Sequence, residues 1–137
     1  MSLTTSTRSR TPLTQLARWV YLVTVWLFAL GTVVQVFAIG MVVLGGQGQW
    51  LEHHQTIGIG MGLLPVFTLL STLFAKLSRT FVLGSAALLL LYAAQYVLVE
   101  VPAPTSVLRA FHAVNAPVLF YLAILLGQKT LVLLRNE

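Results

Sequence analysis

The chain has 137 residues, of which 58% are hydrophobic and 8% are charged. Soluble domains carry about 25% charged residues, so this composition excludes a soluble globular domain and indicates an integral membrane protein. Cysteine is absent, which excludes disulfides, iron–sulfur ligation and thiolate zinc sites. The net charge of +5 does not indicate nucleic acid binding, because no basic face with interleaved aromatic residues accompanies it.

Four apolar segments follow a polar tail at residues 1–16. Each has the roughly 20 residues needed to cross the hydrocarbon layer. Lipid cannot satisfy open backbone groups, so each segment must be an α-helix. We therefore expect an all-α, integral membrane four-helix bundle with up-down-up-down connectivity. The expected spans are residues 19–44, 52–75, 80–99 and 107–127, within a transmembrane domain at 17–134 that a short cytoplasmic end at 135–137 follows.

Basic residues are concentrated on one side of this predicted bundle. They flank the first span, fill the loop between the second and third spans, and follow the fourth span: Arg8, Arg10, Arg18, Lys76, Arg79, Lys129 and Arg135. The opposite side carries Arg109 beside Glu52 and Glu100. The positive-inside rule then predicts a multi-pass protein of the cell inner (plasma) membrane with both termini in the cytoplasm.

The two halves of the chain share a weak repeat. In each half, a glutamine is followed 19 or 17 residues later by a histidine, and a small residue follows the histidine by four. The matching residues are Gln35, His54 and Gly58 in the first half and Gln95, His112 and Ala116 in the second. A pseudo-twofold axis along the membrane normal would place His54 opposite His112.

Two histidines at one level inside an apolar bundle can hold a metal or a haem between them. Neutral imidazole is a good ligand for iron, copper and zinc, and bis-histidine ligation of haem suits electron transfer. Gly58 and Gly62 lie on the same helix face as His54 and could leave a flat recess for a porphyrin ring. His53 points about 100° away from His54, although a shift of one residue in register would exchange the two.

Further polar residues surround this candidate site. Arg109 lies one turn before His112 and could pair with a haem propionate, and Asn115 lies beside Ala116. Gln35 and Gln95 lie deeper in the bundle. Each feature also has a simpler interpretation: small residues at i and i+4 pack helices closely, intramembrane amides join helices, and a histidine at a helix end can be a solvated interface residue.

The pattern of Gln35, His54-x-x-x-Gly58, Gln95 and Phe111-His112-Ala-Val-Asn115 resembles a bacterial family of short four-helix membrane proteins of uncharacterised function, over about residues 17–134. The architecture is also similar to that of the four-helix membrane cytochromes b, whose histidines ligate haem. This resemblance implies the ligand role for His54 and His112 alone. Those cytochromes that conduct electrons across the membrane usually hold two haems on four histidines, so the resemblance does not extend to a complete transmembrane electron path.

The sequence therefore predicts one haem b near the outer face and a redox carrier, as a subunit of a larger complex or a homo-oligomer in the lipid bilayer. Its redox partner would be a quinone or a periplasmic protein. One alternative is a cofactor-free accessory or assembly subunit of a respiratory or photosynthetic complex. Another is a chlorin or copper site at the same two histidines, since imidazole alone does not choose among these centres.

Overall fold

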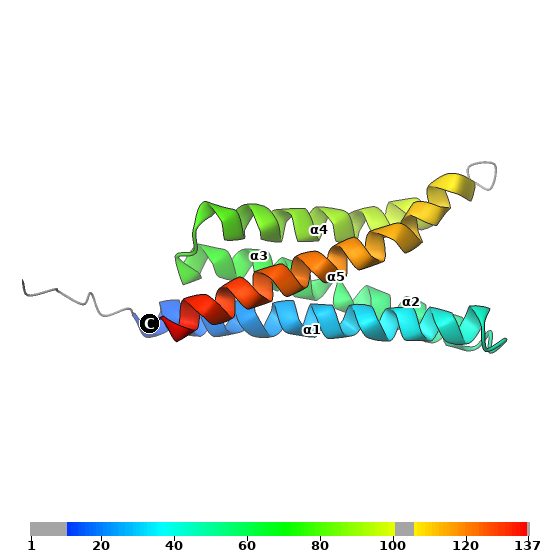
Figure 1. Cartoon of the computed structure of the whole chain (residues 1–137), viewed down its shortest axis with the longest axis horizontal. Helices are drawn as coiled ribbons and strands as arrows, with labels where there is room; N and C mark the ends of the chain where they lie inside the picture. The colour runs from blue at the N-terminus through cyan, green and yellow to red at the C-terminus, as the bar shows by residue number, and fades with distance from the viewer. Residues whose placement is uncertain (1–10, 101–105, 137) are drawn as a thin grey trace, which may run out of the picture.

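The computed structural model describes residues 11–100 and 106–136, and these residues form five α-helices without a strand (Figure 1). The helices are α1 (Pro12–Val43), α2 (Trp50–Met61), α3 (Leu63–Ala75), α4 (Arg79–Glu100) and α5 (Ser106–Arg135). Because α2 and α3 follow each other with only Gly62 between them, the described part of the chain has four segments long and apolar enough to cross a membrane. The all-helical prediction with four spans is confirmed.

Helix α1 begins seven residues before the expected start of the first span, and it includes the end of the predicted polar tail. The reason is local. Thr11 is the N-cap, and its side chain accepts a hydrogen bond from the backbone N–H of Thr14 at 3.4 Å. Pro12 occupies the first helical position, where its missing N–H has no intrahelical partner to lose. These two residues start the helix before the apolar run begins.

The second span is interrupted at Gly62, whereas the sequence predicted one unbroken helix over 52–75. Pro65 lies in the first turn of α3. Proline cannot donate to the carbonyl four residues earlier, and its ring clashes with that group. The carbonyl concerned is that of Met61, the last residue of α2. The proline thus accounts for the break between the two helices.

The helices pack closely at one end of the bundle and separate at the other. Helix α1 packs against α2, α3 and α5, and α4 packs against α3 and α5. In the described part of the chain, no Cα atom of α2 lies within 8 Å of one in α4 or α5. Figure 1 shows α2 beside the final turns of α1, and the start of α5 beside α4. The end of the bundle that carries α2 is therefore open between two helix pairs.

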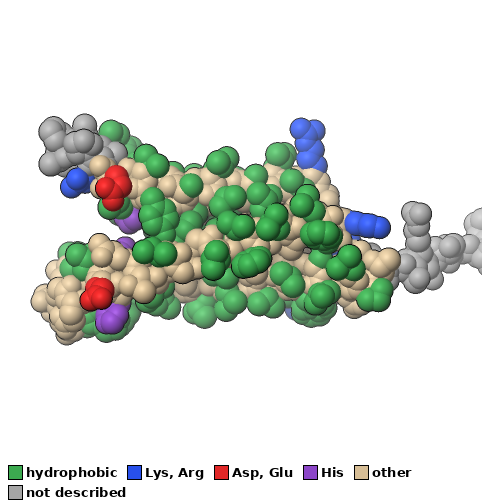
Figure 2. All heavy atoms as spheres, turned by 180° about the vertical axis from the view of Figure 1, so that it is seen from behind, with side chains coloured by type: hydrophobic (Ala, Val, Ile, Leu, Met, Phe, Trp, Pro, Cys, Tyr) green, Lys and Arg blue, Asp and Glu red, His purple; other side chains and the backbone are tan. Residues whose placement is uncertain are grey.

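A fully buried cluster fills the closed part of the bundle. Tyr21, Val25 and Phe28 of α1 meet Leu88 of α4 and Leu119 of α5, and all five are at most 2% exposed. Large apolar side chains also cover the outside of the bundle (Figure 2). An apolar lateral surface of this extent is typical of helices that face lipid, which indicates a membrane protein.

The two ends of the bundle differ in charge. We call the open end the histidine end; it carries His54, His112 and the two carboxylates of the described residues, Glu52 and Glu100. We call the other end the basic end, and its basic side chains are Arg18, Lys76, Arg79, Lys129 and Arg135. Figure 2 shows the acidic and histidine side chains together at one end of the molecule.

Polar side chains tie the helices together toward the basic end. The Arg18 Nε–H donates to the carbonyl of Ala75 at 2.9 Å, and Arg18 is only 6% exposed. Ala75 ends α3, so the guanidinium satisfies a helix-terminal carbonyl and lies at the negative end of the helix dipole. The Tyr21 hydroxyl and the Ser85 Oγ are 3.0 Å apart, and both residues are fully buried. Since Ser85 donates to the Phe81 carbonyl, Tyr21 donates to Ser85.

Tyr21→Phe should therefore lower the free energy of unfolding by about 1 kcal/mol, the usual contribution of one interhelical hydrogen bond in a membrane protein. The measurement is unfolding by sodium dodecyl sulfate in mixed micelles, followed by circular dichroism. Tyr121→Phe is the matched control, because Tyr121 is 64% exposed and its substitution should change the unfolding midpoint little. Equal effects of the two substitutions would contradict the stabilising role of the Tyr21 hydroxyl.

Candidate histidine cofactor site

Helices α2 and α5 bring the rings of His54 and His112 together at the histidine end, edge to face. Their ring centres are 6.3 Å apart and their planes are inclined at 72°. Both side chains are partly buried. Figure 2 shows a cleft between two arms at this end, with histidine side chains on both sides of it. The pairing of these two histidines across the bundle is what the sequence predicted.

A backbone carbonyl fixes each imidazole. Nδ1 of His54 lies 3.2 Å from the carbonyl oxygen of Gln35 on α1, and Nδ1 of His112 lies 3.1 Å from that of Gln95 on α4. A carbonyl oxygen can only accept, so the proton in each pair is on Nδ1. In the neutral ring this leaves the lone pair on Nε2. Both histidines are thus held as the tautomer that binds a metal through Nε2, with the outer-shell hydrogen bond that orients such ligands.

Gln35 makes two hydrogen bonds with His54. Besides the bond to its backbone carbonyl, its side-chain Nε2–H donates to the carbonyl of His54 at 2.9 Å. This second bond also fixes which way the amide points, because Oε1 could not replace Nε2 as a donor. The side-chain Oε1 atoms of both Gln35 and Gln95 are buried and have no hydrogen-bond partner among the described residues. The two glutamines that the sequence singled out are therefore the residues next to the two histidines.

Gly58 of α2 and Gly62, which directly follows α2, leave no empty recess below His54. A Cβ atom at Gly58 would lie 2.9 Å from Nε2 of Gln35, and one at Gly62 would lie 3.4 Å from a ring carbon of Tyr92. The space expected for a flat ring is thus occupied by the Gln35 amide and an aromatic ring. These glycines permit the close approach of side chains from α1 and α4. Because that space is filled, a planar cofactor would have to lie in the cleft between the two helix pairs.

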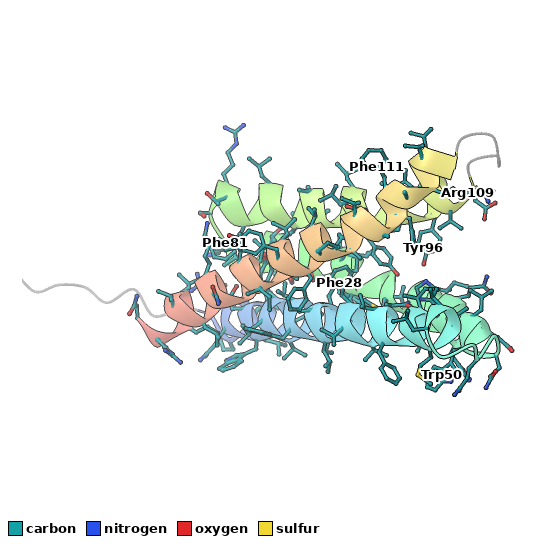
Figure 3. All side chains as sticks on the ribbon, turned by 45° about the vertical axis from the view of Figure 1, so that its right-hand side comes forward. Phe28, Trp50, Phe81, Tyr96, Arg109 and Phe111 are labelled. Carbon is teal, nitrogen blue, oxygen red and sulfur yellow. The ribbon has the colours of Figure 1, made fainter. Side chains whose placement is uncertain are left out.

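Two tyrosines that the sequence analysis missed also belong to the site. The hydroxyl of Tyr92 donates to the carbonyl of Gly58, joining α4 to α2. The hydroxyls of Tyr92 and Tyr96 are 3.3 Å apart. Because Tyr92 has already given its proton to Gly58, Tyr96 is the donor of this pair. Figure 3 shows Tyr96 pointing from α4 toward α2 across the cleft. The available signal in the sequence was their spacing: Tyr92 and Tyr96 are four residues apart, hence on one face of the helix, and Gln95 lies between them.

The inner end of the cleft is aromatic. The ring of Phe28 meets that of Tyr92 at 5.4 Å in an edge-to-face arrangement, and Phe28 is fully buried. Asn115 does not face the cleft as a free polar group: its Nδ2–H donates to the Leu91 carbonyl at 2.8 Å and so ties α5 to α4. Ala116 is partly buried beside it. From Asn115 toward the basic end, the helices pack against one another and the cleft ends.

The remaining candidates lie at the outer rim. His53 is exposed, and its ring contacts Trp50 at 5.3 Å instead of facing His112. The structure thus selects His54 over His53 as the cleft residue. Arg109 is exposed near the start of α5, at the histidine end (Figure 3). Glu52 is exposed on α2.

The side chains available as metal ligands favour a cofactor, such as a metalloporphyrin, that already supplies most of the ligands of its metal. Among residues 11–100 and 106–136, no group of three or more His, Cys, Asp or Glu side chains could hold a metal ion. Two imidazoles are fewer than the three or four protein ligands of a typical zinc site. A metalloporphyrin needs only the two axial ligands. A metal–imidazole bond is about 2 Å long and the nitrogen lies about 1 Å from its ring centre, so two imidazoles sharing one metal have centres about 6 Å apart. The observed 6.3 Å is compatible with this separation, and it also lies within the range of an ordinary edge-to-face ring contact.

Residues 35–103 match a family model described as "Family of unknown function (DUF6220)". The matched range begins at Gln35 and includes His54 and Gln95, whereas His112 lies beyond its end. No curated protein and no solved structure matches the chain.

Proposed function

The chain belongs to DUF6220, a family of unknown function, and we propose that it is a membrane haem protein that carries electrons. His54 and His112 would hold one haem b in the cleft. The supporting observation is the geometry of this pair: ring centres 6.3 Å apart, with both Nδ1 atoms engaged by backbone carbonyls. Haem supplies one-electron redox chemistry, and ligation by two histidines suits electron transfer.

The protein's own residues perform three tasks at this site. The carbonyls of Gln35 and Gln95 set the tautomer and orientation of the imidazoles. Phe28 and Tyr92 close the cleft toward the middle of the bundle and exclude water from its inner end. Arg109, at the rim, offers a cation to a propionate. A haem held by two histidines would supply one-electron transfer, so the role that fits these residues is that of a redox carrier.

The placement of charge supports an orientation for this carrier. All five described basic side chains other than Arg109 lie at the basic end, and the positive-inside rule assigns that end to the cytoplasm. The four spans then alternate in direction, with both termini cytoplasmic, in the inner membrane. His54 and His112 would then hold the haem near the outer face, where a quinone or a periplasmic redox protein could reach it. The matched hydrogen bonds, Gln35 with His54 and Gln95 with His112, support a duplicated hairpin with a pseudo-twofold axis.

The test is the absorption spectrum of protein purified in mild detergent from a haem-replete host, with a pyridine haemochrome assay. We expect a Soret band, a sharp reduced α-band after dithionite, and one haem per chain. A spectrum without a Soret band, unchanged after haem is added, would reject this function and favour a cofactor-free accessory subunit. Metal analysis and pigment extraction of the same sample separate copper and chlorin from haem.

Gln35→Leu should weaken haem binding about tenfold, the lower end of the effect of losing an outer-shell partner of a metal ligand. The substitution removes the amide that donates to the His54 carbonyl, while the backbone carbonyl that accepts from the ring remains. Haem affinity can be measured by titrating haem into the apoprotein. Gln55→Leu, at an exposed position on the same helix as His54, is the control and should bind haem normally. Equal affinities in the two variants would contradict the orienting role of Gln35.

A further inference from the structure

A groove at the basic end lies outside everything described so far. It has a volume of about 490 Å³ and runs between the start of α4 and the end of α5. Part of its lining is polar: Ser78, Thr80 and Lys129. Another part is apolar: Phe81, Val132 and Leu133. Figure 3 shows Phe81 at the end of α4 opposite to Tyr96. The groove therefore joins hydrogen-bond donors and a cation to an apolar wall.

Basic side chains predominate among the described residues at this end of the bundle. Lys129 lines the groove itself, and the carboxylates of the described residues, Glu52 and Glu100, belong to the histidine end. An ammonium and two hydroxyls are the groups that proteins use to bind phosphate. The groove is thus complementary to an anion, and the apolar side chains beside it are complementary to a hydrocarbon chain.

We propose that this groove binds one anionic phospholipid, with the headgroup phosphate at Lys129, Ser78 and Thr80 and an acyl chain along Phe81, Val132 and Leu133. The place of the groove supports this occupant. It lies at the end of two membrane-spanning segments, Arg79–Glu100 and Val107–Arg135, where lipid headgroups meet the protein. A free phosphate would use the polar part of the lining and leave the apolar part without a role. Basic pockets between transmembrane helices are a known type of lipid site. The proposal is independent of the haem.

The experiment uses the full chain in detergent, mixed with dioleoyl phosphatidylglycerol or dioleoyl phosphatidylcholine, and native mass spectrometry to count bound lipids. The wild type should retain one phosphatidylglycerol and little phosphatidylcholine. Lys129→Gln should lower phosphatidylglycerol affinity about tenfold or more, because a hydrogen bond to a charged group is lost. Thr80→Val leaves the charge of the protein unchanged and should lower phosphatidylglycerol affinity about fivefold or more, because the hydrogen bond from the hydroxyl to the phosphate is lost.

Arg79→Gln is the matched control. Arg79 is exposed between two lining residues but does not line the groove. Its substitution removes a nearby charge without removing a lining group, so the loss of affinity should be smaller than in Lys129→Gln. Circular dichroism checks that each variant keeps its helices. Equal losses in Lys129→Gln and Arg79→Gln, with no loss in Thr80→Val, would mean general attraction to basic charge and would overturn the site. Displacement of the lipid by millimolar glycerol phosphate would overturn the lipid as the occupant in favour of a free phosphate.

Discussion

Replacing His112 with alanine is expected to abolish stoichiometric haem binding, and His54→Ala is expected to do the same. Each imidazole supplies one of only two axial ligands, and no third His, Cys, Asp or Glu among the described residues is placed to substitute. Any haem that remains should be five-coordinate and high-spin, with a broadened spectrum. The measurement is haem content per chain after purification, with the absorption spectrum of the ferric and ferrous states.

His53→Ala is the matched control for this experiment. It removes the neighbouring imidazole, which is exposed and packs on Trp50 outside the cleft, and it should leave haem content and spectrum unchanged. Loss of haem in His53→Ala with retention in His54→Ala would show that the register of α2 differs by one residue. Retention of one six-coordinate haem in both His54→Ala and His112→Ala would remove these residues from the site.

Gly58→Leu is expected to have the second large effect, although residue 58 would not itself touch the metal. A Cβ at this position would lie 2.9 Å from Nε2 of Gln35, so the amide must leave the carbonyl of His54. The larger side chain also presses on Tyr96, whose hydroxyl lies 4.0 Å from that Cβ position. Overpacking together with a lost hydrogen bond should lower the free energy of unfolding by about 2–3 kcal/mol. Haem affinity should fall about tenfold or more.

The control for Gly58→Leu lies two residues further along the same helix. Gly60 is exposed, and nothing lies within 4 Å of the Cβ position there. Gly60→Leu should therefore leave haem binding intact, and the higher helix propensity of leucine should stabilise α2 slightly. Unfolding in mixed micelles and haem titration compare the two variants. If both behaved alike, the close packing of α1 against Gly58 would not be what supports the site.

Much of the fold could be predicted from the sequence because the membrane leaves few choices. An apolar run of sufficient length has to become a helix, and four such runs separated by Gly-, Lys- or Pro-containing turns give four spans. The pairing of His54 with His112 could also be predicted, since both histidines open an even-numbered span. The glutamines were recognisable because strongly polar side chains are rare within apolar helices.

Details that depend on neighbouring side chains could not be predicted in the same way. The role of Gly58 depends on Gln35, which is 23 positions earlier and reaches it only after α1 and α2 pack. The hydroxyls of Tyr92 and Tyr96 gain their role only when the fold brings Tyr92 to the Gly58 carbonyl of α2. The start of α1 depends on capping by Thr11, which hydropathy does not detect. The break at Gly62 was detectable from Pro65, since proline disrupts the hydrogen bond to Met61.

The fold also explains how one small bundle can combine stability with an open site. The basic end is closed by buried hydrogen bonds such as those of Tyr21 and Arg18, and the core cluster lies beside them. At the histidine end the helix pairs separate, and the links across the cleft are side chains such as Tyr92. Stability thus comes from one half of the bundle, and the candidate site lies in the other half.

The most direct test of the central claim, that His54 and His112 hold the same haem, is electron paramagnetic resonance of the ferric protein at cryogenic temperature. Haem ligated by two imidazoles is six-coordinate, so this account predicts a low-spin ferric signal that accounts for all of the haem in the sample. A dominant high-spin signal from five-coordinate haem would show that only one histidine binds the metal, and it would contradict the account.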